Sequence, residues 1–176
     1  MRYEWQEKAQ TYLLNRVPLL MTLILMLLFF VPLNSLELSQ FRPMISVICV
    51  FYWVLKKGQV FGYISAFWVG FFADAYSSTP LGVNIMLLML LTMLVKWLAR
   101  YFRNASFSGC WLVFGLVALG FITVKWLFLM IYSGRYLSFG ELFFSFVSTV
   151  LFYPLVAYLN VRVQRRFLPE KIDEQF

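Results

Sequence analysis

The chain has 176 residues, of which 62% are hydrophobic and only 13% are charged, and its net charge is +7. Soluble domains usually carry about 25% charged residues, so this composition excludes an ordinary soluble protein and indicates a single integral membrane domain. The chain contains no histidine, which removes the usual general base and the commonest metal ligand. Its basic residues do not cluster on a module that would bind nucleic acid.

Long apolar runs predict an all-α protein with six transmembrane helices. The second run has only 12 residues, or roughly 18 Å of helix, whereas the bilayer core is about 30 Å thick. We therefore expect the second and third helices to form a short antiparallel hairpin, either shielded by longer neighbours or set in a thinned bilayer. The predicted spans are 17–33, 44–55, 60–75, 81–98, 109–132 and 139–161.

The distribution of basic residues predicts the orientation of the helices. When both termini are placed in the cytoplasm, twelve lysines and arginines fall in inner segments, and only Arg42 and Arg135 fall outside. Lys125 remains inside the fifth helix. Cytoplasmic loops carry such an excess of basic residues, so the pattern favours six spans with both termini inside.

The second predicted helix has a signal at each end. Arg42 and Pro43 predict its start, because proline suits the first turn, where its missing N–H has no intrahelical partner. Tyr52 and Trp53 come before two lysines, an order typical of a helix end held at the level of the lipid headgroups. We interpret all four residues as structural.

A ridge of small residues marks the third predicted helix. Gly58, Gly62, Ala66, Gly70 and Asp74 recur every four residues and would share one helix face. Small residues let another helix backbone approach closely, which stabilises helix packing in lipid. We interpret the ridge mainly as packing within this chain, and an interface with another protein is the alternative.

Asp74 is a carboxylate in an apolar segment. A charge in hydrocarbon costs about 2.5–3.5 kcal/mol on insertion scales, so it requires a partner, water or a proton. Arg42, at the outer start of the neighbouring helix, is the first candidate partner, and Lys125 is the second. A structural ion pair is our main interpretation, and a proton or substrate site or a loop cap are the alternatives.

The turn after Asp74 predicts the start of the fourth helix. Thr79 would cap this helix, with Pro80 at its first position, followed by Leu81. Gly82, so early in a helix, suggests that another backbone approaches closely. The chain has no phosphate-binding loop, zinc motif, nucleophile elbow or pair of catalytic carboxylates, so we predict neither an enzyme nor a cofactor.

Together, these features resemble one family. Phe41-Arg42-Pro43, eight residues, Tyr52-Trp53, the glycines, Asp74 and Leu81-Gly82 resemble the MreD family of rod shape-determining proteins. The resemblance covers about 42 residues, and the length, the six spans and the basic inner loops agree with it elsewhere. The family pattern offers no counterpart for Lys125, whose role stays open.

The resemblance implies a non-enzymatic scaffold of the bacterial cell-elongation complex in the inner membrane, which helps organise peptidoglycan synthesis and rod shape. It implies MreC as a partner and, directly or through MreC, the elongation transpeptidase, RodA and MreB. It also implies a fold like that of the substrate-binding subunits of energy-coupling-factor vitamin transporters. The alternative is therefore the small-molecule-binding subunit of a vitamin transporter, which requires an outward pocket with convergent polar groups.

Overall fold

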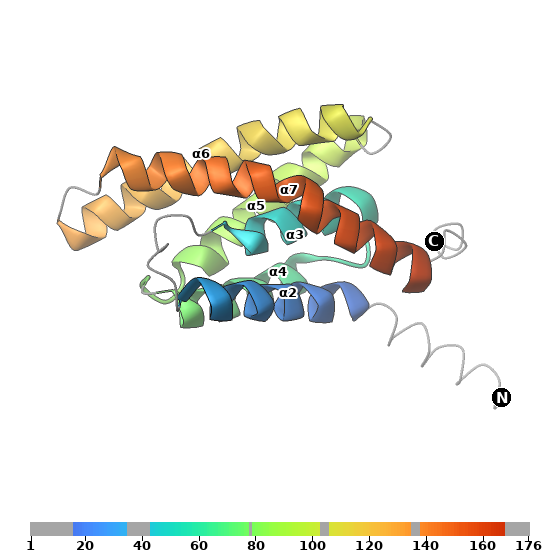
Figure 1. Cartoon of the computed structure of the whole chain (residues 1–176), viewed down its shortest axis with the longest axis horizontal. Helices are drawn as coiled ribbons and strands as arrows, with labels where there is room; N and C mark the ends of the chain where they lie inside the picture. Colours follow the sequence, from blue (N-terminus) through green and yellow to red (C-terminus); the bar gives the residue numbers. More distant parts are fainter. Residues whose placement is uncertain (1–15, 35–42, 78, 103–105, 135–137, 168–176) are drawn as a thin grey trace.

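A computed structural model describes residues 16–34, 43–77, 79–102, 106–134 and 138–167 (Figure 1). This part of the chain contains six helices and no strands, which confirms the predicted all-α class. Three of the helices, α5, α6 and α7, are long and apolar enough to cross a membrane. The helices are α2 Val17–Asn34, α3 Ile45–Lys57, α4 Tyr63–Tyr76, α5 Val83–Phe102, α6 Phe107–Ser133 and α7 Phe139–Phe167.

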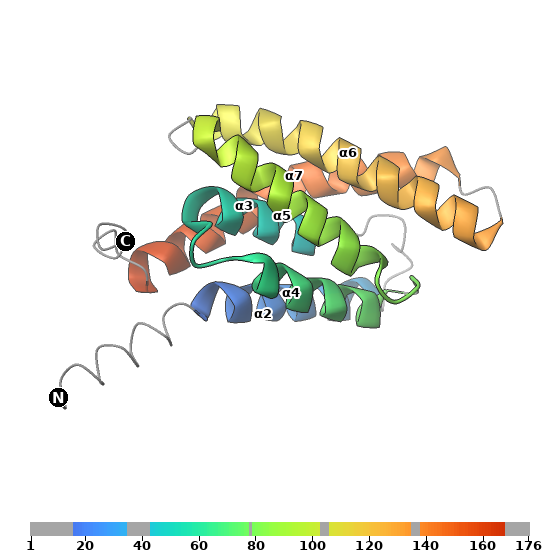
Figure 2. The same ribbon diagram turned by 180° about the vertical axis from the view of Figure 1, so that it is seen from behind.

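Successive helices run back and forth along the long axis of the molecule. Figures 1 and 2 show α2 and α4 on one side, α6 on the opposite side, and α3 between them. The start of α2 and the end of α7 lie at the same end of the molecule, on the right in Figure 1. We call this end the terminal end, and the other end the distal end.

α3 is the central helix of the bundle. It packs against α2, α5 and α7, and Phe51 and Trp53 are fully buried, with Tyr52 only 6% exposed. The 13-residue helix, roughly 20 Å long, is thus enclosed by protein, so its length need not match the bilayer. Tyr52 and Trp53 are therefore enclosed by neighbouring helices, and their predicted place at the level of the lipid headgroups stays a prediction.

α7 holds α3 at both of its ends. At the distal end, the backbone N–H of Met44 donates to Oγ1 of Thr149 at 3.0 Å, which satisfies an amide at the start of α3. At the other end, the Tyr52 hydroxyl donates to Oε1 of Gln164 at 2.7 Å. Because Met44 is the residue before the helix, Pro43 lies outside the first turn that the sequence predicted for it.

The third predicted helix begins later than expected and has a different neighbour. The backbone of Gly62 is extended, and α4 begins at Tyr63. α4 packs chiefly against α5 and only lightly against α3, so the expected packed hairpin of these two short helices is not what forms. α5 lies against both α3 and α4 and forms the main contact of each.

Aromatic rings join three helices in the core. The rings of Phe114 in α6 and Tyr153 in α7 stack with their centroids 4.3 Å apart. Phe51 of α3 meets Phe114 edge-on at 5.2 Å. Such ring pairs add about 0.5–1.5 kcal/mol each to the free energy of packing.

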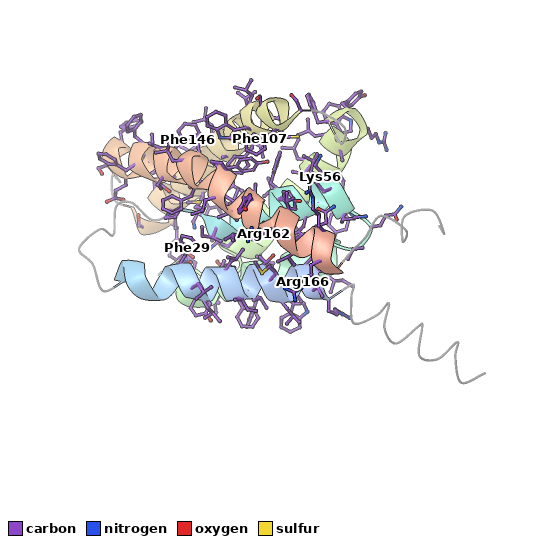
Figure 3. The ribbon with its side chains drawn as sticks, turned by 45° about the vertical axis from the view of Figure 1, so that its right-hand side comes forward. Phe29, Lys56, Phe107, Phe146, Arg162 and Arg166 are labelled. Atoms are coloured by element: carbon purple, nitrogen blue, oxygen red, sulfur yellow. The ribbon has the colours of Figure 1, made fainter. Side chains whose placement is uncertain are left out.

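Charge separates along the long axis of the described part of the chain. Every described lysine and arginine except Lys125 lies at or toward the terminal end, and Figure 3 shows Lys56, Arg162 and Arg166 in the same half of the molecule. Both described carboxylates, Asp74 and Glu141, lie in the distal half, near the end of α4 and the start of α7. Among the described residues, the two ends of the bundle therefore differ in charge.

Candidate functional site

Asp74 joins the last turn of α4 to the first turn of α5. Its side chain is only 3% exposed. Oδ1 accepts hydrogen bonds from the backbone N–H and the side-chain Nδ2 of Asn84, at 3.0 and 2.9 Å, and from Oγ1 of Thr79 at 3.3 Å. Oδ2 accepts from the backbone N–H of Gly82 at 2.8 Å and of Ile85 at 3.4 Å.

These donors define what the carboxylate does. The first N–H groups of an α-helix have no partner within the helix, and the start of a helix carries a partial positive charge. Asp74 accepts hydrogen bonds from three of these N–H groups and places a negative charge where the helix dipole favours it. A residue of α4 therefore caps α5, and this contact fixes the geometry of the turn between them.

The described contacts of Asp74 do not include the predicted ion pair. All the donors from the described residues are uncharged, and Lys125, a predicted partner, interacts with the carboxylate through space and not by direct contact. Arg42, the other predicted partner, lies outside the described residues. Of the three interpretations of Asp74, the cap is the one that the described contacts match.

Asn84 is the residue that sequence reasoning missed. It is buried and bonds to Asp74 through both its backbone and its side chain, and its Nδ2 also reaches Ser77 and Thr79, each at 3.2 Å. A polar amide in the first turn of an apolar helix was the signal that pointed to it.

The turn itself differs from the sequence prediction in two respects. α5 begins at Val83, so Pro80 precedes the helix, and Thr79 bonds to Asp74 where it was expected to cap α5. Gly82 has a φ of 105°, a conformation that favours glycine, and a Cβ there would meet nothing within 4 Å. Backbone conformation, and not a close neighbour, explains this glycine. Leu81, beside it, is 75% exposed.

Gly70 and Ala66 form the seam between α4 and the rest of the bundle. A Cβ built on Gly70 would stand 2.6 Å from Cα and 2.9 Å from N of Ile85, so the backbones of α4 and α5 are in direct contact. Ala66, one turn earlier, is fully buried. Gly58 and Gly62 precede α4, and Gly62 has open space around it, so the small face within α4 consists of Ala66, Gly70 and Asp74.

A cavity of about 150 Å³ adjoins this junction at the distal end. Lys125 of α6 lines it, together with Asn84 and Ser77 from the two sides of the turn. No described residue forms a hydrogen bond or an ion pair with the Lys125 ammonium group. The remaining lining residues are Met26, Phe29, Pro43, Met44, Ile45, Ser46, Ala73 and Tyr76.

The described part of the chain contains no cluster of side chains that could hold a metal ion. No group of three or more cysteine, aspartate or glutamate side chains gathers there, and the sequence has no histidine. The chemistry available at the junction is hydrogen bonding and charge.

Comparison with known proteins identifies the family of the chain. No curated protein and no solved structure matches the chain. The model of the family described as rod shape-determining protein MreD matches residues 7–163. The match covers most of the sequence and includes all the residues on which the predicted resemblance rests, so the chain belongs to the MreD family of shape-determining membrane proteins.

Proposed function

We propose that the chain is a non-enzymatic scaffold of the bacterial cell-elongation complex, which binds MreC and helps place peptidoglycan synthesis. In this proposal six helices span the inner membrane, both termini are cytoplasmic, and the fold resembles that of energy-coupling-factor substrate-binding subunits. Family membership supports a role in rod shape within a membrane complex.

The single observation that carries the proposal is an exposed stripe on α4. Ile64, Phe67, Trp68 and Phe71 follow the i, i+3, i+4, i+7 spacing of one helix face, and each is at least 41% exposed. Trp68 meets Phe67 and Phe71 edge-on, with centroids 6.0 and 6.1 Å apart. We call these four residues the α4 stripe.

The length of α4 favours a protein partner over lipid for the α4 stripe. The helix has 14 residues, roughly 21 Å, and unlike α3 it is exposed on one side. A span shorter than the bilayer core of about 30 Å thins the bilayer or associates with other helices. Aromatic side chains are enriched in protein interfaces, so a transmembrane helix of a partner would cover the stripe favourably.

We assign this place to the membrane anchor of MreC. MreC is held in the membrane by such an anchor. A helix lying along α4 would cover the aromatic side chains of the α4 stripe and would shield the short α4 from the thicker bilayer core. The Asp74 cap and the Gly70 contact hold α4 against α5, so the stripe is presented on a rigid support. Contact with MreB, RodA and the elongation transpeptidase would then follow directly or through MreC.

Co-purification of MreC in mild detergent tests this proposal. The double variant Phe67→Ala/Trp68→Ala should insert at wild-type level and retain less MreC. The matched control is Leu112→Ala/Leu116→Ala on α6, because these leucines are 70% and 73% exposed and lie away from the stripe. Equal recovery of MreC with both variants and with wild type would contradict the proposal.

A depletion experiment separates the scaffold from the transport alternative. A scaffold determines where the cell wall is synthesised, whereas a transport subunit supplies a solute to the cell. We expect depleted rod cells to become round, and we expect that no added vitamin restores their shape. Restoration of rods by a nutrient would favour the vitamin-transport subunit.

A further inference from the structure

The distal cavity has the composition of a ligand site. Its wall from α2, α3 and α4 is largely apolar, with Met26, Phe29, Met44 and Ile45 among its residues, and Lys125 reaches it from α6. Phe29, which is labelled in Figure 3, also meets Phe152 of α7 edge-on, with ring centroids 5.6 Å apart. Binding sites for small molecules are typically apolar pockets with a few polar groups that set orientation.

Lys125 is the polar group that sets this cavity apart. It is the one described cation in the distal half of the bundle, and no described residue contacts its ammonium group directly. A cation within a membrane domain is costly unless an anion or water meets it. The hydroxyl of Ser46, on the cavity wall, provides a second hydrogen-bonding group there.

The Asp74 carboxylate does not contact the Lys125 ammonium group directly. Its two oxygens already accept hydrogen bonds from three backbone N–H groups, the Asn84 amide and the Thr79 hydroxyl. The start of α5 further offsets the negative charge of Asp74. The hydrogen-bonding capacity of the Asp74 carboxylate is used within the α4–α5 turn. The Lys125 ammonium group can therefore bind an anion in the cavity.

We propose that the distal cavity binds the anionic group of a small amphiphile, a carboxylate or a phosphate, with Lys125 as its counter-ion. The ammonium donates to the anionic oxygens, Ser46 donates a further hydrogen bond, and the methionines and Phe29 contact the apolar part. This inference concerns a ligand of the chain and does not depend on its role as a scaffold.

The volume limits the ligand. The cavity is open on one side, and its volume of about 150 Å³ is that of a cavity that holds benzene, so the part of a ligand inside it is an anionic group with a few carbons. Two sources meet this requirement: a free short-chain acid or phosphate ester, and the phosphate region of an anionic lipid whose chains stay in the bilayer.

Titration of the purified full chain in a neutral detergent tests the proposal. Ligand-observed NMR would give Kd for butyrate and butyl phosphate, with butyramide and butanol as neutral matches. Dihexanoylphosphatidylglycerol, with dihexanoylphosphatidylcholine as its zwitterionic match, forms the lipid arm. Because MreC is absent from the sample, the result is independent of the pull-down described above.

Variants identify the site. Lys125→Gln should raise Kd by roughly tenfold or more, because a charge-assisted hydrogen bond is lost, and Lys125→Arg should keep most of the affinity. Lys96→Gln is the matched control, since Lys96 lies over the ring of Tyr63 toward the terminal end. Met26→Trp, which fills the cavity without changing charge, should also abolish binding, and it serves where Lys125→Gln fails to fold.

The two arms have distinct outcomes. Binding of the butyl anions alone supports a free acid or ester, and binding of the anionic lipid alone supports a headgroup. Equal affinity for the neutral matches, unchanged affinity in both Lys125→Gln and Met26→Trp, or no binding of any anionic probe to the folded wild type would overturn the proposal.

Discussion

The indole N–H of Trp111 in α6 donates to the backbone carbonyl oxygen of Val150 in α7, at 3.2 Å. Pro154 lies four residues after Val150, and proline has no N–H, so this carbonyl lacks the i+4 donor that an α-helix normally supplies. The Trp111 side chain of the neighbouring helix thus replaces the backbone hydrogen bond that Pro154 removes. In lipid, where water cannot satisfy the carbonyl, such a substitute donor is especially important.

We expect the effect of Trp111→Phe to depend on Pro154. The substitution should lower the free energy of unfolding by about 1 kcal/mol, because the Val150 carbonyl loses its donor. In a Pro154→Ala background the helix supplies an N–H, and Trp111→Phe should then cost less. Unfolding in mixed micelles of all four proteins of this cycle measures the difference. The same loss in both backgrounds would contradict the assignment.

Gly70→Ala should destabilise the protein strongly, although it adds only one methyl group. The added Cβ would stand 2.6 Å from the Cα of Ile85, and backbone atoms cannot move aside as a side chain can. We expect a loss of about 1–3 kcal/mol in the free energy of unfolding, typical of overpacking, together with weaker MreC recovery. Gly115→Ala in α6 is the control, since a Cβ there meets nothing within 4 Å. Equal stability of the two variants would show that α4 and α5 are farther apart.

The Asp74 cap predicts an order among substitutions. Asp74→Leu removes every acceptor and leaves the N–H groups of Gly82 and Asn84 without one, at roughly 1–3 kcal/mol for each buried donor. Asp74→Asn keeps one oxygen acceptor and should be clearly milder. Thermal unfolding in detergent compares the two. If Asp74→Asn were as damaging as Asp74→Leu, a charge partner such as Arg42 would have to be invoked.

The sequence predicted the helices well, because apolar runs and their boundaries are local properties. It could not predict which helices pack together: the short link after α3 suggested a packed hairpin, but the enclosure of α3 by the longer helices decided its neighbours. Likewise, Gly62 and Gly70 have the same spacing in the ridge, yet only Gly70 meets a backbone. Spacing predicts a shared face and not what faces it.

The partner of Asp74 was missed for a related reason. A carboxylate in an apolar run directs attention to cations, which are visible as residue types, and Arg42 and Lys125 were the obvious choices. The donors in the structure are chiefly backbone N–H groups, which every residue has and no pattern displays. Asn84 and Thr79 contribute the two side-chain donors, and Asn84 was the one that the sequence analysis did not consider.

The last prediction concerns membrane topology. The basic residues of the described chain gather toward the terminal end, where α2 begins and α7 ends, while Asp74 and Glu141 lie in the distal half. Basic segments are retained in the cytoplasm, so the terminal end should face the cytoplasm and the α4–α5 turn should face the periplasm. Reporter fusions after Arg103 and Arg166 should give cytoplasmic signals, and a fusion at Ser78 should give a periplasmic one. A cytoplasmic signal at Ser78 would refute both the six-span orientation and the placement of the distal cavity on the outer side of the membrane.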